Sequence, residues 1–136
     1  MKLSVAVLAD QANIAAGGKL NVFGIFDRVW AARYPAIHPF MVLVLRLRAE
    51  FADGGKTYKL RIRLIDEDGR EVMKGEGELA VPPIPAGEIQ SHNMILTFAG
   101  IQFRRAGSYA FHIEQDTEEI GRVDLTLAIG SGPPRQ

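Results

Sequence analysis

The sequence offers few groups suited to catalysis. Among its 136 residues there is no cysteine, and no serine lies in a Gly-x-Ser-x-Gly turn. His38, His92 and His112 lack any spacing that would make them neighbours. Gly17-Gly18-Lys19 lacks the spacing of a phosphate-binding loop. We therefore predict a protein that is not an enzyme and has no catalytic residues.

Carboxylates gather at two predicted turns. Residues 66–68 lie beside Gly69, and residues 116–119 form a second acidic turn. Carboxylate oxygens are ligands that calcium prefers, but Asp beside Gly is also ordinary hairpin chemistry. Antiparallel strands place the two turns at opposite ends of the domain, so they cannot share an ion. We expect no metal and no cofactor.

Arginine and aromatic residues form the best candidate ligand site. Guanidinium groups bind anions in charge-assisted hydrogen bonds, and a Trp ring offers an apolar face with a polar edge. The candidate ligand-binding residues are Trp30, Arg33, Tyr34, Arg104 and Arg105. We expect a small anion or a glycan as their ligand, although Trp30 also fits the role of a packing anchor.

Charge gives no general reason to expect nucleic acid or a membrane as a partner. Sixteen basic residues balance sixteen acidic ones. A basic stripe on two neighbouring strands would contain Arg46, Arg48, Lys59, Arg61 and Arg63. Glu76 and Glu78 would neutralise that stripe, and no exposed aromatic residues interleave with it to stack on bases.

Apolar and polar residues alternate along most of the chain, between Gly, Pro, Asn and Asp turns. This pattern predicts an all-β antiparallel two-sheet sandwich of about eight strands, either jelly-roll-like or immunoglobulin-like. The predicted strands are 2–9, 20–30, 39–51, 57–66, 71–81, 91–99, 108–115 and 121–129. A short helical turn over 10–16 is also expected. Residues 1–129 then form one domain, and residues 130–136 a flexible tail.

The segment around Asp68-Gly69 predicts a hairpin in detail. A two-residue type I′ turn at this dipeptide places Leu64 opposite Met73, and it pairs Arg61 with Glu76. If each strand runs the length of the domain, residues 31–38, 66–70 and 100–106 meet at one end. Residues 10–19, 52–56, 82–90 and 116–119 meet at the other, and ligands are sought at these loops.

Two segments carry a resemblance to a known family. They are residues 9–29, which include Gly18-Lys19-Leu20-Asn21-Val22-Phe23-Gly24-Ile25-Phe26, and residues 105–122, which include Gly107-Ser108-Tyr109-Ala110-Phe111. The chain resembles an uncharacterised bacterial family of small β-sandwich proteins. The resemblance implies the fold and a bacterial origin, and it transfers no activity and no catalytic residue.

Apolar residues are more numerous than one core requires. A strand of a monomeric sandwich has one core face, so an apolar second face lies under a loop or against another protein. In the second predicted strand both faces are apolar, with Val22 and Phe26 on one and Phe23 and Ile25 on the other, and either pair can be the one that faces away from the core. Val42, Val44 and Ile95 also lie on faces otherwise predicted to face solvent. We hypothesise that these apolar second faces form an interface with a protein partner or a second copy.

The function expected from these features is a non-catalytic structural or interaction module that self-associates through apolar strand faces. The alternative is a sandwich that binds a small anion or glycan with the loops at one end. Asp10 ends the first apolar stretch early, so we interpret it as a strand rather than a signal peptide. Together with the absence of cysteine, this interpretation favours the cytoplasm.

Overall fold

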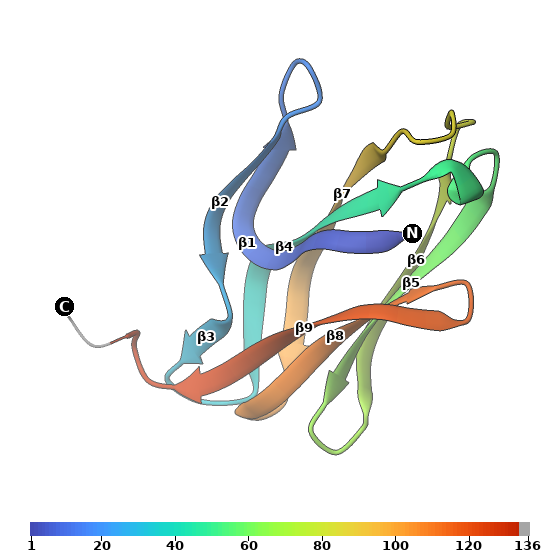
Figure 1. The fold of residues 1–136 in the computed structure, drawn as a ribbon. Helices are drawn as coiled ribbons and strands as arrows, with labels where there is room; N and C mark the ends of the chain where they lie inside the picture. Colours follow the sequence, from blue (N-terminus) through green and yellow to red (C-terminus); the bar gives the residue numbers. More distant parts are fainter. Residues whose placement is uncertain (134–136) are drawn as a thin grey trace.

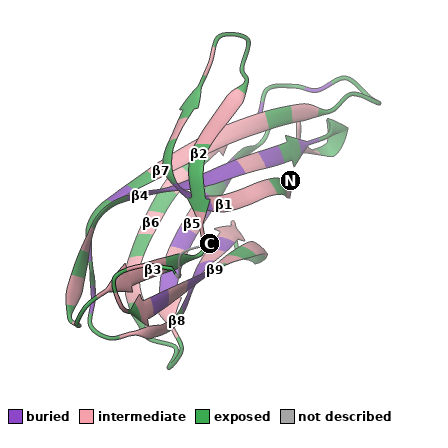
Figure 2. Ribbon diagram, turned by 90° about the vertical axis from the view of Figure 1, so that its left-hand side faces the viewer, coloured by how far each residue is buried: buried purple, intermediate pink, exposed green. Residues whose placement is uncertain are grey.

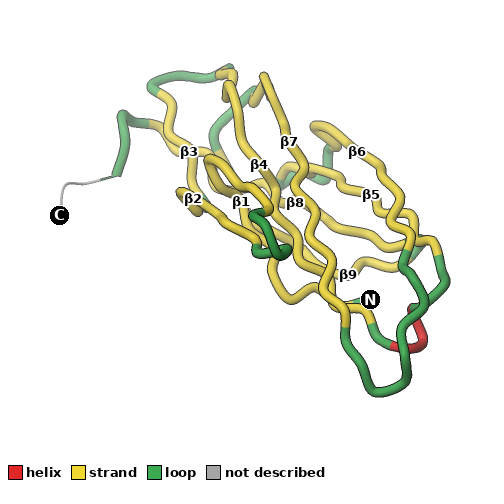
Figure 3. The backbone as a smooth tube through the Cα atoms, turned by 90° about the horizontal axis from the view of Figure 1, so that it is seen from above, coloured by secondary structure: helices red, strands yellow, loops and turns green. Residues whose placement is uncertain are grey.

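The computed structural model describes residues 1–133, and these residues form nine strands and one short 3-10 turn (Figures 1 and 3). The strands are β1 (Lys2–Ile14), β2 (Leu20–Phe26), β3 (Arg28–Ala31), β4 (Ala36–Ala49), β5 (Thr57–Asp66), β6 (Glu71–Ala80), β7 (Gln90–Phe103), β8 (Gly107–Gln115) and β9 (Glu118–Ile129). The 3-10 turn is Phe51–Asp53. The predicted tail starts directly after β9, and residues 134–136 of it lie outside the described residues.

The strands form two sheets, which confirms the all-β sandwich. One sheet has the order β2-β1-β4-β7, and the other has the order β3-β9-β8-β5-β6. Their facing sides enclose the core, which appears as the buried stretches of β4, β5 and β8 in Figure 2. Leu60, Ile62 and Leu64 alternate along β5 with half-buried or exposed charged residues, as the period of two predicts.

The β5–β6 hairpin has the predicted register but a different turn. Leu64 lies opposite Met73, and Arg61 lies opposite Glu76. The turn has three residues, 67–69, because Asp66 pairs with Arg70 and the Gly69 N–H donates to the Asp66 carbonyl oxygen at 3.0 Å. A bulge at Val72 offsets the extra turn residue, so the two departures from the prediction cancel.

The predicted strand 20–30 is two strands in the structure. The chain bends at Asp27 and crosses from the edge of one sheet to the edge of the other. There β3 pairs with β9 in a parallel ladder, which is the exception to the predicted antiparallel arrangement. The bend raises the number of strands from the expected eight to nine.

The predicted helical turn over 10–16 is wrong. β1 continues through this segment to Ile14, and its last residues pair with β2. Ala and Gln favour a helix weakly, and the apolar residues of β2 provide a pairing partner that overrides this preference. Residues 10–24 therefore form the outer part of a long hairpin, which we call the arm.

The arm covers the outer face of the β2-β1-β4-β7 sheet. On that face Val42 and Val44 are at most 2% exposed, and they form a cluster with Ala9. Leu20 and Val22 of the arm pack against this cluster. The tip of the arm contacts β7, where the Asn93 side chain donates to the Gly18 carbonyl oxygen at 3.2 Å.

Candidate functional site

A cleft of about 750 Å³ lies at the open side of the sandwich, between the edge strands β6 and β7. Residues 71–73 of β6 line one wall, and residues 97–102 of β7 line the other. The remaining lining residues are Asp66, Arg70, Arg104, Arg105 and Tyr109. The cleft is thus at the end where residues 66–70 and 100–106 were predicted to meet.

Two glycines keep the open side of the sandwich sparsely packed. Gly75 and Gly77 on β6 lie opposite the core residues Ile62 and Leu60, so both face inward. A Cβ at Gly75 would meet nothing within 4 Å, and one at Gly77 would meet only the Met94 methyl group at 3.9 Å. Two consecutive inward positions of β6 without side chains leave room next to β7.

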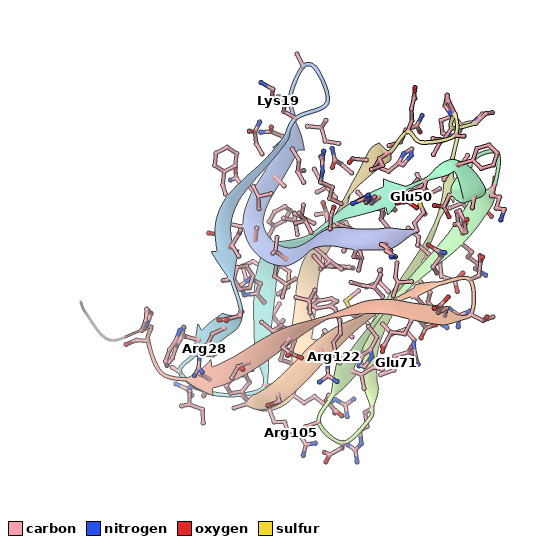
Figure 4. The ribbon with its side chains drawn as sticks, in the orientation of Figure 1. Lys19, Arg28, Glu50, Glu71, Arg105 and Arg122 are labelled. Atoms are coloured by element: carbon pink, nitrogen blue, oxygen red, sulfur yellow. The ribbon has the colours of Figure 1, made fainter. Side chains whose placement is uncertain are left out.

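The basic groups of the cleft are not all compensated. Arg105 forms ion pairs with Asp68 and, at 3.9 Å, with Asp66, and Figure 4 shows it beside the β5–β6 turn. Arg70 and Arg104 have no carboxylate within 4 Å among residues 1–133. Two guanidinium groups therefore remain available to an anion at this end of the cleft.

Tyr109 fixes the loop between β7 and β8, which carries Arg104 and Arg105. Its hydroxyl donates a hydrogen bond of 2.7 Å to the Arg105 carbonyl oxygen. Burial raises the pKa of Tyr109, and the Asp66 and Glu67 carboxylates raise it further. The hydroxyl is therefore a neutral donor at physiological pH. It holds the backbone of the loop at Arg105, and Arg104 is the preceding residue.

The predicted ligand-binding residues do not form a single site in the structure. Arg104 and Arg105 line the cleft, whereas Trp30 lines a separate hollow with Arg28, whose guanidinium lies 5.6 Å from the ring centroid. Figure 4 shows Arg28 and Arg105 well apart. Tyr34 donates to the Ala128 carbonyl oxygen at 2.8 Å and packs against the core, and Arg33 is exposed.

The predicted interface residues do not form a single exposed surface either. Val22 of the arm packs with Val42, Val44 and Ile95 in the cluster between the arm and the sheet. The chain itself therefore buries Val42 and Val44 and half-buries the other two residues. Phe26 packs against the core, with its ring centroid 6.1 Å from that of His38. Two of the predicted residues remain open to solvent, namely Phe23, which is 54% exposed, and Ile25, which is 63% exposed.

Sequence reasoning did not single out Arg70, residues 71–73 or residues 97–102 as site residues. Arg70 was considered only as part of a turn, and strand alternation does not reveal which strands lie at an edge. One signal was present in the sequence: β7 contains no Asp, Glu, Lys or Arg in 14 residues. A long strand without charges stands out only once its edge position is known.

The acidic turns lie at opposite ends of β5. Asp66 ends this strand, whereas the Asp116 side chain accepts a hydrogen bond from the Lys59 N–H near its start. In residues 1–133, no three His, Asp or Glu side chains come together as a potential metal site. Within the same residues there is no helix of the length and hydropathy needed to cross a lipid bilayer.

Comparison with known proteins agrees with the predicted resemblance to an uncharacterised family. No curated protein matches the sequence. A family of unknown function (DUF6941) matches residues 4–128, which include every strand except the first two residues of β1 and the last residue of β9. The chain therefore belongs to this family of unknown function.

Proposed function

We propose that this domain is a non-catalytic binding module and that its ligand site is the cleft between β6 and β7. The observation that carries the proposal is the pair of arginines, Arg70 and Arg104, at a cleft that also exposes apolar atoms of Val72 and Met73. Guanidinium groups without an internal partner favour an anion, and the apolar atoms favour a ligand with an apolar body. A carboxylate attached to an apolar chain meets both requirements.

The same cleft suits a glycan less well. Protein sites that stack sugars need an open aromatic ring, and the two aromatic residues among the described lining residues are Phe98 and Tyr109. These rings are 8% and 5% exposed, respectively, because both belong to the core. Of the two ligand classes expected from the sequence, we therefore favour the anion.

Octanoate and octanamide distinguish a site that requires a charged ligand from one that binds any apolar chain. In an NMR titration we expect octanoate to shift the backbone signals of residues 97–102, and octanamide to shift them much less. Arg104→Ala should weaken octanoate binding about tenfold or more, because a charge-assisted hydrogen bond is lost. Arg48→Ala is the matched control, because Arg48 pairs with Glu50 outside the cleft. Equal responses to the acid and the amide would overturn the proposal.

Self-association is a second candidate function, and the exposure of Phe23 and Ile25 supports it. Large apolar side chains open to solvent on an edge strand are a common feature of interfaces. If two copies associate there, Ile25→Glu should yield a folded monomer, whereas Phe26→Glu should unfold the domain because Phe26 packs against the core. Light scattering with circular dichroism measures both. A wild type that is monomeric at high concentration contradicts this candidate.

For the setting of the module we propose a bacterial cytoplasm. The sequence contains no cysteine, which suits a reducing compartment where disulfides do not form. The bacterial part of this proposal comes from the family resemblance of residues 9–29 and 105–122. Expression of a tagged chain followed by cell fractionation tests the location.

A further inference from the structure

β7 is a long edge strand with one side unpaired. Its residues 90–99 pair without interruption with residues 40–49 of β4, and β7 is the last strand of its sheet. In an antiparallel ladder, alternate residues of an edge strand direct their N–H and C=O groups away from the neighbouring strand. The free side of β7 therefore presents a regular row of donors and acceptors.

The two strands that flank the cleft differ in how their edges are protected. β6 carries charged residues along its length, as edge strands usually do, and these are Glu71, Lys74, Glu76 and Glu78. β7 contains no charged residue and no proline. Its one irregularity is Gly100, with φ of 67°, which lies beyond the continuous ladder. Of the two edges, β7 is the one open to a further strand.

The cleft runs along the backbone edge of β7 rather than over one of its faces. Six consecutive residues, 97–102, line the cleft, and three consecutive residues, 71–73, line it from β6. Successive side chains of a strand point to opposite faces, so a hollow above one face would be lined by alternate residues. A continuous run is expected where the hollow lies beside the strand. A ligand in the cleft thus meets the free backbone groups of β7.

We infer that the ligand of this cleft is an extended segment of another protein that adds to the edge of β7, with apolar side chains and at least one carboxylate. This inference rests on the proposed function of the cleft and specifies its ligand. Backbone pairing supplies affinity in such strand addition, and side chains supply specificity. The carboxylate meets Arg70 and Arg104, and an apolar side chain contacts Val72 and Met73.

The charges of the cleft favour such a segment over a second copy of this chain. A two-fold contact through β7 would place the strand against itself, and β7 has no carboxylate to offer the two arginines. An acidic segment of a different protein supplies the missing charge.

The test uses a fluorescein-labelled octapeptide of alternating valine and threonine with a free C-terminal carboxylate. Two further versions are N-methylated at either set of alternate residues, which removes the backbone donors of one edge and retains the side chains. We expect the parent peptide to bind, as measured by fluorescence anisotropy, and one N-methylated version to bind about tenfold more weakly or worse. Hydrogen exchange should show new protection of outward β7 amides that includes residues 97–99, where the ladder borders the cleft, and no new protection in β6.

Several results overturn the inference. One is equal binding of all three peptides, and another is new protection in β6 instead of β7. A third is a wild-type dimer whose outward β7 amides are already protected, which would make a second copy the occupant. Absence of peptide binding, together with an intact response to octanoate, would reject strand addition and leave the proposed function standing. If the protein binds neither the peptide nor octanoate, the proposed function itself is rejected.

Discussion

The side-chain amide of Asn93 donates a hydrogen bond to the carbonyl oxygen of Gly18, and this 3.2 Å contact joins β7 to the tip of the arm. The contact holds the arm across the outer face of its own sheet. β4 is consequently buried on both faces: Leu43 and Leu45 face the core, and Val42 and Val44 face the arm. The arm therefore acts as a partial third layer.

Replacement of Val44 by alanine tests whether the arm forms a true packing layer. Val44 is 0% exposed under the arm, so we expect Val44→Ala to lower the free energy of unfolding by about 2 kcal/mol. Ile14→Ala is the matched control, because Ile14 lies on the arm itself but is 51% exposed. It should change stability by less than about 0.5 kcal/mol. Urea denaturation measures both, and a neutral Val44→Ala would show that the arm adds no stability.

Ile62 tests the core that alternation predicts. Its side chain is 1% exposed in the centre of β5, so Ile62→Ala should cost about 2–5 kcal/mol. Ile129→Ala serves as the control, because Ile129 is the same residue type at 68% exposure. An unchanged unfolding midpoint for Ile62→Ala would contradict the assignment of the core face.

Alternation predicted most strands and one register because both depend on neighbours along the chain. Leu64 faces Met73 as predicted, since a slip of one residue would turn every side chain of β6 to the opposite face. The turn type was wrong because a three-residue turn with a bulge gives the same register. The break at Asp27 was missed because both halves of the predicted strand are apolar.

The candidate site was predicted only in part, because it depends on contacts between distant segments. Loop positions brought Arg104 and Arg105 near residues 66–70, as expected. Trp30 lies in a separate hollow because β3 crosses to the edge of the second sheet and pairs with β9. The covering of Val42 by the arm also required tertiary structure, since the sequence allows either a loop or a partner as its cover.

The pKa of Tyr58 predicts a loss of stability in alkali. Burial is the largest cause that raises this pKa from 10.0 to about 12, and the Asp53 carboxylate, which accepts a 2.8 Å hydrogen bond from the Tyr58 hydroxyl, contributes the next part of the rise. The folded state therefore keeps a proton that the unfolded chain loses at lower pH. The resulting stabilisation is complete below pH 10 and is lost as the pH rises toward about 12.

Two variants separate the causes of this alkaline loss. Tyr58→Phe should lower stability at neutral pH by about 0.5–1.5 kcal/mol, since the hydrogen bond is lost, and should flatten the decline between pH 10 and 12. Asp53→Asn removes the carboxylate but retains burial, the largest cause, so its decline should be reduced and still present. Urea denaturation as a function of pH measures both. Identical alkaline slopes in all three proteins would contradict the assignment to Tyr58.

Gly24 and Gly75 should respond in opposite ways to alanine, because their backbone conformations differ. Gly24 has φ of 70°, in the left-handed region, and a Cβ at this position would collide with the Asp10 carboxylate. Gly75 lacks a positive φ, and its Cβ would meet nothing within 4 Å. Gly24→Ala should therefore lower stability by about 1–2 kcal/mol or more. Gly75→Ala should raise stability by up to about 1 kcal/mol, because glycine loses more backbone entropy on folding.

A double variant divides the cost at Gly24 into its two parts. Asp10→Ala in the Gly24→Ala background removes the colliding carboxylate but leaves the left-handed backbone. The denaturation midpoint of the double variant should then lie between those of Gly24→Ala and the wild type, because the cost of the left-handed φ remains. Full recovery would assign the whole effect to the collision. No recovery would assign it to the backbone, and a destabilised Gly75→Ala would contradict the open space on the inner side of β6.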